Sequence, residues 1–378
     1  MMFRSPRRLA LFCTNFLPDS QVFVYEQLRQ YRAWEADVFA WRRFNEQRFD
    51  FPRVVQAEPA YIVRGRSRRF SQAFAERRYA LVHAHFGPAG AYARRYAVGA
   101  GIPLVVTFHG YDVPLLASRR RFLPLHLPYA VGGPRLLRDM RLAICASTEL
   151  SEMLGELGVE PRRRRVHRLG IDLERFAFQP ERDGLGVIMV GRLVEKKGFE
   201  YGLRAFALAV SRGAAARLTI VGDGERRAAL ERLAAELGIR ERVAFVGPQT
   251  NEAVARLMTS ASVLLAPSVV ARDGNRESGL IVVKEAAAAG TVPIGTWHGG
   301  IPDSIEDERT GYLVPERDAQ GMGDRLAQLL LDPALRARLA AEGRAKMERE
   351  FDNRRLVAGL EEIYDELARE GAASVSAP

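Results

Sequence analysis

The sequence has little cysteine, almost no lysine and no long apolar run. Two cysteines, Cys13 and Cys145, occur among 378 residues, so a disulfide framework is excluded. Each lies in an apolar segment, where a free thiol behaves as a small buried hydrophobic group. No run approaches the roughly 18 apolar residues of a membrane-spanning helix. The apolar stretch after the basic N-terminus is short and interrupted by Asn15, so we expect no signal peptide and a cytoplasmic protein.

Several motifs of nucleotide and metal chemistry are also missing. The sequence contains no GxxxxGK[ST], HExxH, GxSxG or CxxC motif and no strand–GxGxxG–helix unit. P-loop proteins, zinc proteases, serine hydrolases and the common dinucleotide-binding proteins are therefore disfavoured. A DxD pair is absent as well, so the sequence does not indicate a divalent ion held by aspartates. We expect no metal and no cofactor.

Positive charge is concentrated in the first half of the chain. The formal net charge is +10, and residues 1–175 contain 29 arginines and no lysine against 16 acidic residues. A basic half suggests an anionic partner: nucleic acid, an acidic membrane surface or an anionic substrate. The alternative is an arginine-rich, solvated surface. Because no nucleic-acid recognition motif accompanies the charge, we expect no nucleic-acid partner.

Short apolar runs alternate with helical patterns along most of the chain. This alternation is typical of parallel sheets covered by helices and predicts an α/β fold with doubly wound sheets. The polar residues 178–186 contain proline, glycine and charges, and we expect them to link two domains. The expected strands are 9–16, 36–41, 81–86, 104–109, 142–147 and 166–169, then 186–191, 217–224 (a strand and its turn), 243–247, 262–268 and 291–296. Helices are expected over 199–211 and 281–289, and a helical tail over 324–370.

The segment GRLVEKKG, residues 191–198, has the character of an anion site. It follows an expected strand and leads into a helix. The free backbone N–H groups of the helix start, glycines that allow a ligand to approach closely, and cationic side chains would together form an anion site. Arg192 and Lys197 would supply the cations. The chain has four lysines, and two of them are in this segment. A solvated turn is the alternative.

A second candidate is the pair of carboxylates Glu277 and Glu285, eight residues apart. Glu277 falls in a loop after an expected strand and Glu285 in the helix that follows. Gly279 and Leu280 would offer backbone N–H groups at the start of that helix. One carboxylate could accept hydrogen bonds from sugar hydroxyls and the other from a ribose. Two glutamates at this spacing are common by chance, and a surface helix position is the alternative for Glu285.

His109, in TFHGYD, ends an expected strand of the first half. A histidine at the carboxyl end of a parallel strand faces the crevice where such sheets bind ligands; a packed loop histidine is the alternative. HAHF, residues 83–86, also ends a strand. Its two histidines would face one side of the sheet and could hold a metal, but no third ligand is evident.

Taken together and in order, these segments resemble the family-4 retaining glycosyltransferases with the GT-B fold. The likeness covers nearly the whole chain and is densest from residue 186 to 315. It is closest to the exopolysaccharide and colanic-acid branch. The segments that carry it are FLPDSQVFVYEQL, HAHFGPAG, TFHGYDV, LGIDLERF, PSVVARDGNRES and HGGIPDSIEDERTGYLVP.

The resemblance implies two Rossmann-like domains facing a cleft: an acceptor-side domain over 1–178 and a nucleotide-sugar domain over 186–354. The helix over 355–370 would return to the first domain. Arg192 and Lys197 match the pair that contacts the donor diphosphate. Glu277 and Glu285 match an E-x7-E motif, the first beside the donor sugar and the second on the ribose. His109 matches a first-domain histidine near the donor sugar.

Three places depart from the family's pattern. The loop TNFLPDSQV after the first strand has no glycine, Gly279 stands two residues after Glu277 instead of three, and Lys284 replaces a usually apolar residue. These departures bear on acceptor placement and on the donor contacts of Gly279 and Leu280.

The favoured function is retaining transfer of a hexose from a UDP- or GDP-linked donor to a saccharide acceptor, with Arg192, Lys197, Glu277 and His109 as the catalytic group. The acceptor would be lipid-linked, and the basic half would contact the cytoplasmic face of an anionic membrane. Two alternatives are a nucleotide-sugar epimerase of the same fold and a catalytically silent nucleotide-sugar-binding protein.

Overall fold

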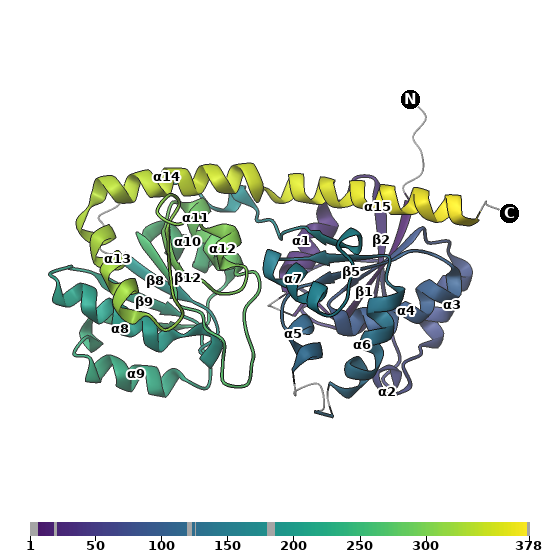
Figure 1. The fold of residues 1–378 in the computed structure, drawn as a ribbon, viewed down its shortest axis with the longest axis horizontal. Helices are drawn as coiled ribbons and strands as arrows, with labels where there is room; N and C mark the ends of the chain where they lie inside the picture. Colours follow the sequence, from purple (N-terminus) through teal and green to yellow (C-terminus); the bar gives the residue numbers. More distant parts are fainter. Residues whose placement is uncertain (1–6, 19–20, 119–122, 125, 180–185, 376–378) are drawn as a thin grey trace. The chain divides into compact units, whose positions relative to one another are not determined.

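The computed structural model describes residues 7–18, 21–118, 123–124, 126–179 and 186–375, and the chain divides into two units. Unit 1 comprises Met1–Leu169 and Arg354–Pro378, and unit 2 comprises Gly170–Asn353. Each unit is built around its own parallel sheet (Figure 1). Within the described residues, no helix is long and apolar enough to cross a membrane.

The unit 1 sheet has the strand order β3-β2-β1-β4-β5-β6-β7, and every neighbouring pair is parallel. Its strands are β1 (Arg7–Phe16), β2 (Trp34–Arg43), β3 (Val54–Gln56), β4 (Leu81–His85), β5 (Leu104–Phe108), β6 (Leu142–Cys145) and β7 (Arg164–Val166). The helices are α1 (Val22–Gln30), α2 (Tyr61–Arg64), α3 (Arg68–Glu76), α4 (Gly87–Ala100), α5 (Asp112–Ala117), α6 (Leu127–Asp139), α7 (Thr148–Glu156) and α15 (Asn353–Val375).

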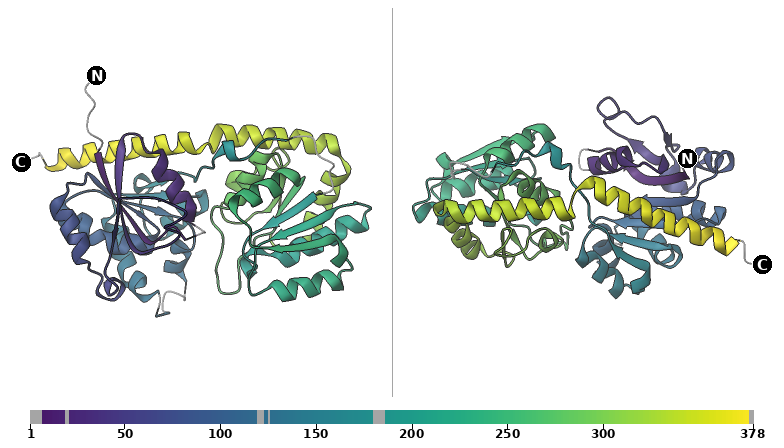
Figure 2. Two further views of the ribbon diagram at one scale, coloured as in Figure 1. Left: turned by 180° about the vertical axis from the view of Figure 1, so that it is seen from behind. Right: turned by 90° about the horizontal axis from the view of Figure 1, so that it is seen from above.

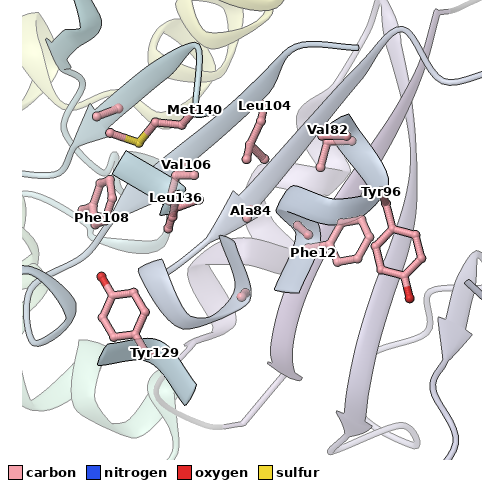
Figure 3. Close-up of a cluster of buried hydrophobic side chains, with 14 of the residues drawn as sticks. Phe12, Val82, Ala84, Tyr96, Leu104, Val106, Phe108, Tyr129, Leu136 and Met140 are labelled. Carbon is pink, nitrogen blue, oxygen red and sulfur yellow. The ribbon is translucent and has the colours of Figure 1, made fainter. Parts of the chain in front are cut away.

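Alternate residues of β1 point to opposite faces of this sheet, and each face has its own apolar core. On one face the ring of Phe12 stacks on Phe39 with 4.8 Å between centroids. Figure 3 shows this core, to which β4, β5, α4 and α6 contribute Val82, Val106, Tyr96 and Leu136. Cys13 and Cys145 are both buried and free, as the sequence predicted.

The other face of the unit 1 sheet is covered by α15, the last helix of the chain (yellow in Figures 1 and 2). Its apolar residues Leu360, Ile363 and Leu367 pack into the same core as Leu9 and Leu11. Polar contacts fix the helix as well. Glu361 Oε1 accepts hydrogen bonds from the backbone N–H groups of Arg32, Ala33 and Trp34 at 2.9, 2.8 and 3.1 Å.

The unit 2 sheet has the order β10-β9-β8-β11-β12-β13, again with parallel neighbours. Its strands are β8 (Gly186–Val190), β9 (Arg217–Val221), β10 (Val243–Gly247), β11 (Val263–Ala266), β12 (Val292–Thr296) and β13 (Tyr312–Val314). The helices are α8 (Phe199–Ser211), α9 (Arg227–Glu236), α10 (Asn251–Ser260), α11 (Ile281–Ala289), α12 (Ile301–Ser304), α13 (Ala319–Leu331) and α14 (Pro333–Glu350).

Both sheets are doubly wound, which confirms the predicted fold class. In unit 1, β1, β2 and β3 follow one another toward one edge of the sheet, and the next strand, β4, pairs with the other side of β1. In unit 2, β8, β9 and β10 are arranged in the same way, and β11 pairs with the other side of β8. The order reverses between β1 and β4 and between β8 and β11. In sheets of this kind, ligands bind at the carboxyl ends of the strands beside such a reversal.

The division between the units lies earlier in the chain than the linker expected at 178–186. Ile171, Leu173 and Phe176 pack in a unit 2 core with Met347 and Phe351, so burial assigns them to unit 2. Residues 180–185 of the expected linker lie outside the described residues. The last expected strand of unit 1, 166–169, is observed as β7 at Arg164–Val166.

Candidate active site

Two loops of unit 2 follow β8 and β11, the neighbouring strands at which the order of the sheet reverses. The first runs from Gly191 to Gly198, and the second, residues 267–280, leads into α11. The two loops are in direct contact, since Val269 N donates to Lys196 O at 2.9 Å. Gly198 has a φ of 62°, and a Cβ there would lie 1.9 Å from Pro267 O. The close approach therefore requires glycine.

Glu277 is held between two lysines of the first loop. Lys196 Nζ lies 2.9 Å from Glu277 Oε1, and Lys197 Nζ lies 3.3 Å from Glu277 Oε2. All three side chains are largely buried, at 12 to 15 % exposure. Burial alone would raise the pKa of Glu277, but the two ammonium groups outweigh it and hold the pKa at about 2. Glu277 is therefore ionised at any physiological pH.

The cluster carries more positive than negative charge. Burial lowers the pKa of Lys197, the attraction of Glu277 opposes this, and the positive charges of Lys196 and Arg192 lower it further. Arg192 is exposed at the start of the same loop. Two lysines thus contact one carboxylate and Arg192 lies in the same loop, which leaves a surplus of positive charge suited to an anionic ligand such as a diphosphate.

A buried histidine supports the backbone of Glu277. Glu277 N donates to His298 Nε2 at 3.0 Å, and His298 Nδ1 lies 2.7 Å from Glu316 Oε1. Because Nε2 accepts, the proton of the neutral ring is on Nδ1 and is donated to Glu316. Glu316 also accepts from Val270 N at 2.9 Å. His298 opens the family segment HGGIPDS, but the sequence alone assigns it no role.

Glu285 lies in the middle of α11 and is partly buried. Burial raises its pKa to about 7, against the opposing attraction of Arg175. Among the residues that the structure describes, no hydrogen bond holds its carboxylate, which fits a group that accepts from a ligand. Gly279 and Leu280 come directly before α11. The Leu280 side chain is buried in the core. Lys284 is buried, with Nζ 4.6 Å from the centroid of the Phe351 ring.

In unit 1, His109 directly follows β5 and contacts His85, the last residue of β4. His85 Nδ1 lies 2.9 Å from His109 Nε2, and the two rings stack with 5.1 Å between centroids. Phe86 and Phe23 pack against His109 at 4.5 and 4.8 Å. The imidazole is thus held by aromatic rings on several sides.

Asp112 fixes the turn that carries His109. Its buried carboxylate accepts hydrogen bonds from Gly87 N and Gly110 N, both at 3.0 Å, and so joins the loops that follow β4 and β5. Burial raises the pKa of Asp112, and the backbone donors oppose that shift. Asp112 lies within the family segment TFHGYDV, but this role is not evident from the sequence.

The other histidine of β4, His83, has structural partners. Its Nδ1 lies 2.5 Å from the Tyr364 hydroxyl of α15, and its Nε2 lies 2.7 Å from Thr107 Oγ1. His83 and His85 face the same side of the strand, as expected, with ring centroids 4.6 Å apart. Within the described part of the chain, no three His, Cys, Asp or Glu residues are grouped to hold a metal ion.

Of the predicted site residues, unit 2 brings Arg192, Lys197 and Glu277 to one pair of touching loops. It adds Lys196, the second lysine of the first loop, to which the sequence assigned no role. Glu285 lies in α11, and Gly279 and Leu280 end the second loop directly before that helix. His109 belongs to unit 1. The catalytic roles assigned to these residues stay predictions.

Comparison with known proteins finds related sequences along most of the chain. Residues 171–346 match the family model "Glycosyl transferases group 1", and residues 20–175 match "Glycosyltransferase Family 4". The amylovoran biosynthesis glycosyltransferase AmsK of Erwinia amylovora is 33 % identical over 291 residues, which cover 75 % of this chain and 69 % of that protein. The putative colanic acid biosynthesis glycosyltransferase WcaL of Escherichia coli is 32 % identical, covering 74 % and 70 %.

Solved structures show the same fold at lower sequence identity. HepE of Anabaena, in complex with UDP, has a TM-score of 0.78 and 19 % identity, and the match covers 96 % of this chain and all (100 %) of HepE. Sucrose-phosphate synthase of Thermosynechococcus elongatus has a TM-score of 0.77 and 20 % identity, covering 96 % and 99 %.

Proposed function

The chain belongs to the family-4 glycosyltransferases of the GT-B fold, and on this premise we propose that it transfers a hexose from a nucleotide-diphosphate sugar to a saccharide in exopolysaccharide or cell-surface glycan synthesis. The observation that carries the proposal is the cluster of Lys196, Lys197 and Glu277 at the strand-order reversal of unit 2. AmsK and WcaL are named for exopolysaccharide pathways, and the HepE structure contains UDP.

Unit 2 supplies the groups that the leaving nucleotide needs. As the bond to the sugar breaks, negative charge grows on the diphosphate, and the cations Arg192, Lys196 and Lys197 stabilise it without reorganising. Glu285 accepts hydrogen bonds from the ribose hydroxyls. The donor is UDP- or GDP-linked, and no metal or cofactor takes part.

Glu277 does not attack the sugar in this scheme. Its carboxylate is bound to two ammonium groups, and its pKa of about 2 marks a weak nucleophile. We assign to it the orientation of the lysines and a contact with the donor sugar. The sugar is transferred with retention by a front-face reaction, in which the leaving phosphate oxygen helps to remove the acceptor proton. His109 of unit 1 contacts the donor sugar.

We assign the acceptor side to unit 1 and expect a lipid-linked saccharide at the cytoplasmic membrane face. On α6, Leu127 and Val131 lie one turn apart and are 48 % and 59 % exposed. They border a groove of about 670 Å³ that Leu116, Leu137 and Val159 also line. Apolar side chains on a basic unit fit a peripheral contact with anionic lipid. Release from anionic vesicles by high salt supports this contact, and retention in high salt argues against it.

A transfer assay tests the function. The chain is incubated with UDP- and GDP-linked hexoses and a lipid-saccharide extract of the producing cells, and the product is analysed by mass spectrometry and by NMR of the anomeric linkage. We expect one nucleotide to be consumed and one hexose to be added with retained configuration. An epimerised donor without transfer would indicate the epimerase alternative. Nucleotide binding without either reaction would indicate a silent binding protein.

A further inference from the structure

His298 lies just after β12, and its buried ring reaches the loop that carries Glu277. The side chain is 0 % exposed, and its Nε2 lies 3.0 Å from Glu277 N. A backbone N–H group can only donate, so Nε2 must accept this hydrogen bond. The ring is therefore neutral and carries its proton on Nδ1. No other arrangement of the protons preserves the bond to Glu277.

The proton on His298 Nδ1 faces Glu316, which follows β13. Nδ1 lies 2.7 Å from Glu316 Oε1, and the other carboxylate oxygen, Oε2, accepts from Val270 N at 2.9 Å. Arg317 Nη1 lies 3.3 Å from the same Oε2, and Arg317 Nη2 donates to Val270 O at 2.6 Å. Glu316 thus joins the His298 ring to a second point, near the start of the loop that carries Glu277.

The turn that carries His298 is itself fixed in place. Thr296 Oγ1 donates to Ser268 O at 2.6 Å, and His298 N donates to Thr296 O at 2.7 Å. Gly299 has a φ of 58°, and a Cβ there would lie 2.3 Å from Glu277 O. The backbone nitrogen and the carbonyl oxygen of Glu277 are therefore both in close contact with this turn, which leaves the Glu277 backbone little freedom to shift.

The two lysines of the first loop do not by themselves determine where Glu277 lies. Lys196 Nζ and Lys197 Nζ end long, flexible side chains, so both can follow the carboxylate if the loop moves. His298 differs from them because its ring is rigid, buried and attached to a fixed turn. The place of the Glu277 backbone is therefore set by His298, and the lysines adapt to its carboxylate.

We propose that His298 and Glu316 are positioning residues that set the place of Glu277 and thereby its contact with the donor sugar. His298 accepts from Glu277 N, and Glu316 fixes the orientation and the tautomer of the His298 ring. A displacement of about 1 Å in a reacting complex costs about 100-fold in rate, so a small shift of the Glu277 backbone is enough to slow transfer. The proposal rests on the proposed function, since it supposes that Glu277 contacts the donor sugar.

Two substitutions of His298 separate its hydrogen bond to Glu277 from its presence in the core. In His298→Gln the amide oxygen reaches approximately the position of Nε2 and can still accept from Glu277 N. In His298→Asn the shorter amide reaches only the position of Nδ1 and leaves Glu277 N without an acceptor. We expect His298→Gln to keep kcat within about threefold, and His298→Asn to lose about 10- to 100-fold, the range for residues that orient a functional group.

Binding measurements distinguish positioning from a general structural role. The two ligands compared are the nucleoside diphosphate that the wild type binds and the corresponding nucleotide sugar. We expect His298→Asn to bind the nucleoside diphosphate as the wild type does and the nucleotide sugar about tenfold more weakly, because the sugar contact alone depends on the place of Glu277. Matching melting temperatures of His298→Asn and His298→Gln show that both fold. Equal losses for the two ligands, or equal kcat in the two variants, would overturn the proposal.

Glu316→Gln tests the second positioning residue. An amide has one acceptor oxygen, which can serve His298 Nδ1 or Val270 N but not both. We expect kcat to fall about tenfold. The control is Glu306→Gln, which removes a carboxylate of unit 2 whose partner is Lys346 at 3.0 Å, and we expect it to keep the wild-type kcat. A wild-type kcat in Glu316→Gln would overturn the role of Glu316.

NMR tests the arrangement of the protons without relying on activity. In the 15N-histidine spectrum of the wild type at neutral pH, we expect His298 Nδ1 to be protonated and Nε2 to be unprotonated. The signals of His298 are identified by their absence in His298→Gln. A His298 protonated on Nε2 would overturn the proposal, because it cannot accept from Glu277 N. A wild type that transfers no sugar would refute the proposed function, while the spectrum and the two affinities would still decide what His298 does.

Discussion

Lys197 Nζ lies 3.3 Å from Glu277 Oε2, although the two residues come from loops that follow different strands of the unit 2 sheet. The parallel arrangement brings these loops together, because β8 and β11 are neighbours and both end at the same edge. A buried ion pair of this kind contributes little net stability, since desolvation offsets the attraction. Its value to the protein is that it orients cations in a site with surplus positive charge.

Glu277→Gln tests whether the carboxylate orients the lysines or holds the nucleotide. The change removes the negative charge from the cluster and leaves the cations. We expect UDP to bind at least as tightly as to the wild type, while kcat falls by about 100-fold or more because the donor sugar loses its contact with the carboxylate. Calorimetry and initial rates provide the two measurements.

Glu195→Gln is the matched control for that variant. Glu195 belongs to the same loop and its side chain is 34 % exposed. The substitution therefore removes the same charge from the loop without disturbing the buried cluster. We expect both UDP affinity and kcat to remain near the wild-type values. A tenfold loss of UDP affinity in Glu277→Gln, with Glu195→Gln unchanged, would contradict the account.

Donor binding is expected to depend on pH through Glu285. Its pKa of about 7 lies above the ordinary value of 4.5 because burial disfavours the charged form, so the free protein holds this carboxyl protonated below pH 7. Taken alone, the raised pKa of Glu285 adds to the free energy of unfolding below pH 4.5, where the carboxyl is protonated. This contribution is lost as the pH rises to about 7. Ribose hydroxyls donate to the ionised form, so binding below pH 7 must release the proton.

We therefore expect the affinity for the nucleotide sugar to rise about tenfold between pH 6 and pH 8. A sugar-linked diphosphate suits the titration because it does not change its own charge in this range. Glu285→Gln should bind more weakly and show no such pH dependence. An unchanged slope in Glu285→Gln would assign the effect to another group.

Gly198→Ala tests the contact between the two loops. A Cβ at Gly198 would lie 1.9 Å from Pro267 O, whereas at Gly213, with a φ of 93°, it would meet nothing within 4 Å. Both substitutions carry a left-handed backbone penalty of about 1–2 kcal/mol, but Gly198→Ala must also push the loops apart. We expect Gly198→Ala to melt lower than Gly213→Ala and to lose at least about tenfold in UDP affinity through the displaced lysines.

The sequence was sufficient for the regular parts of this fold. The observed bounds of α8 and α11 are those that the apolar periodicity predicted, 199–211 and 281–289. These helices have a clear apolar face and end near a glycine or a polar turn. The short strands β3 and β13 were missed, since three residues at the edge of a sheet give little pattern.

The supporting residues of the candidate site could not be predicted in the same way. Lys196, His298, Asp112 and His85 act through contacts with residues distant in sequence, such as Glu277 N on His298 Nε2. Their partners are determined by which strands are neighbours, and spacing along the chain does not contain that information. The boundary of the units was placed too late for the same reason, because Ile171 and Phe176 pack against the distant helix α14 and the residues after it.

The central claim is that the lysine cluster of unit 2 binds the donor diphosphate, and calorimetric titration of UDP, GDP and ADP into the wild type and Lys197→Ala tests it most directly. Arg232→Ala, which removes an exposed cation of α9, is the control. We predict that UDP or GDP binds the wild type and the control alike and that Lys197→Ala loses a few kcal/mol of binding free energy, about 100-fold in affinity. Equal binding to Lys197→Ala and the wild type, or no binding of any nucleotide, would contradict the claim.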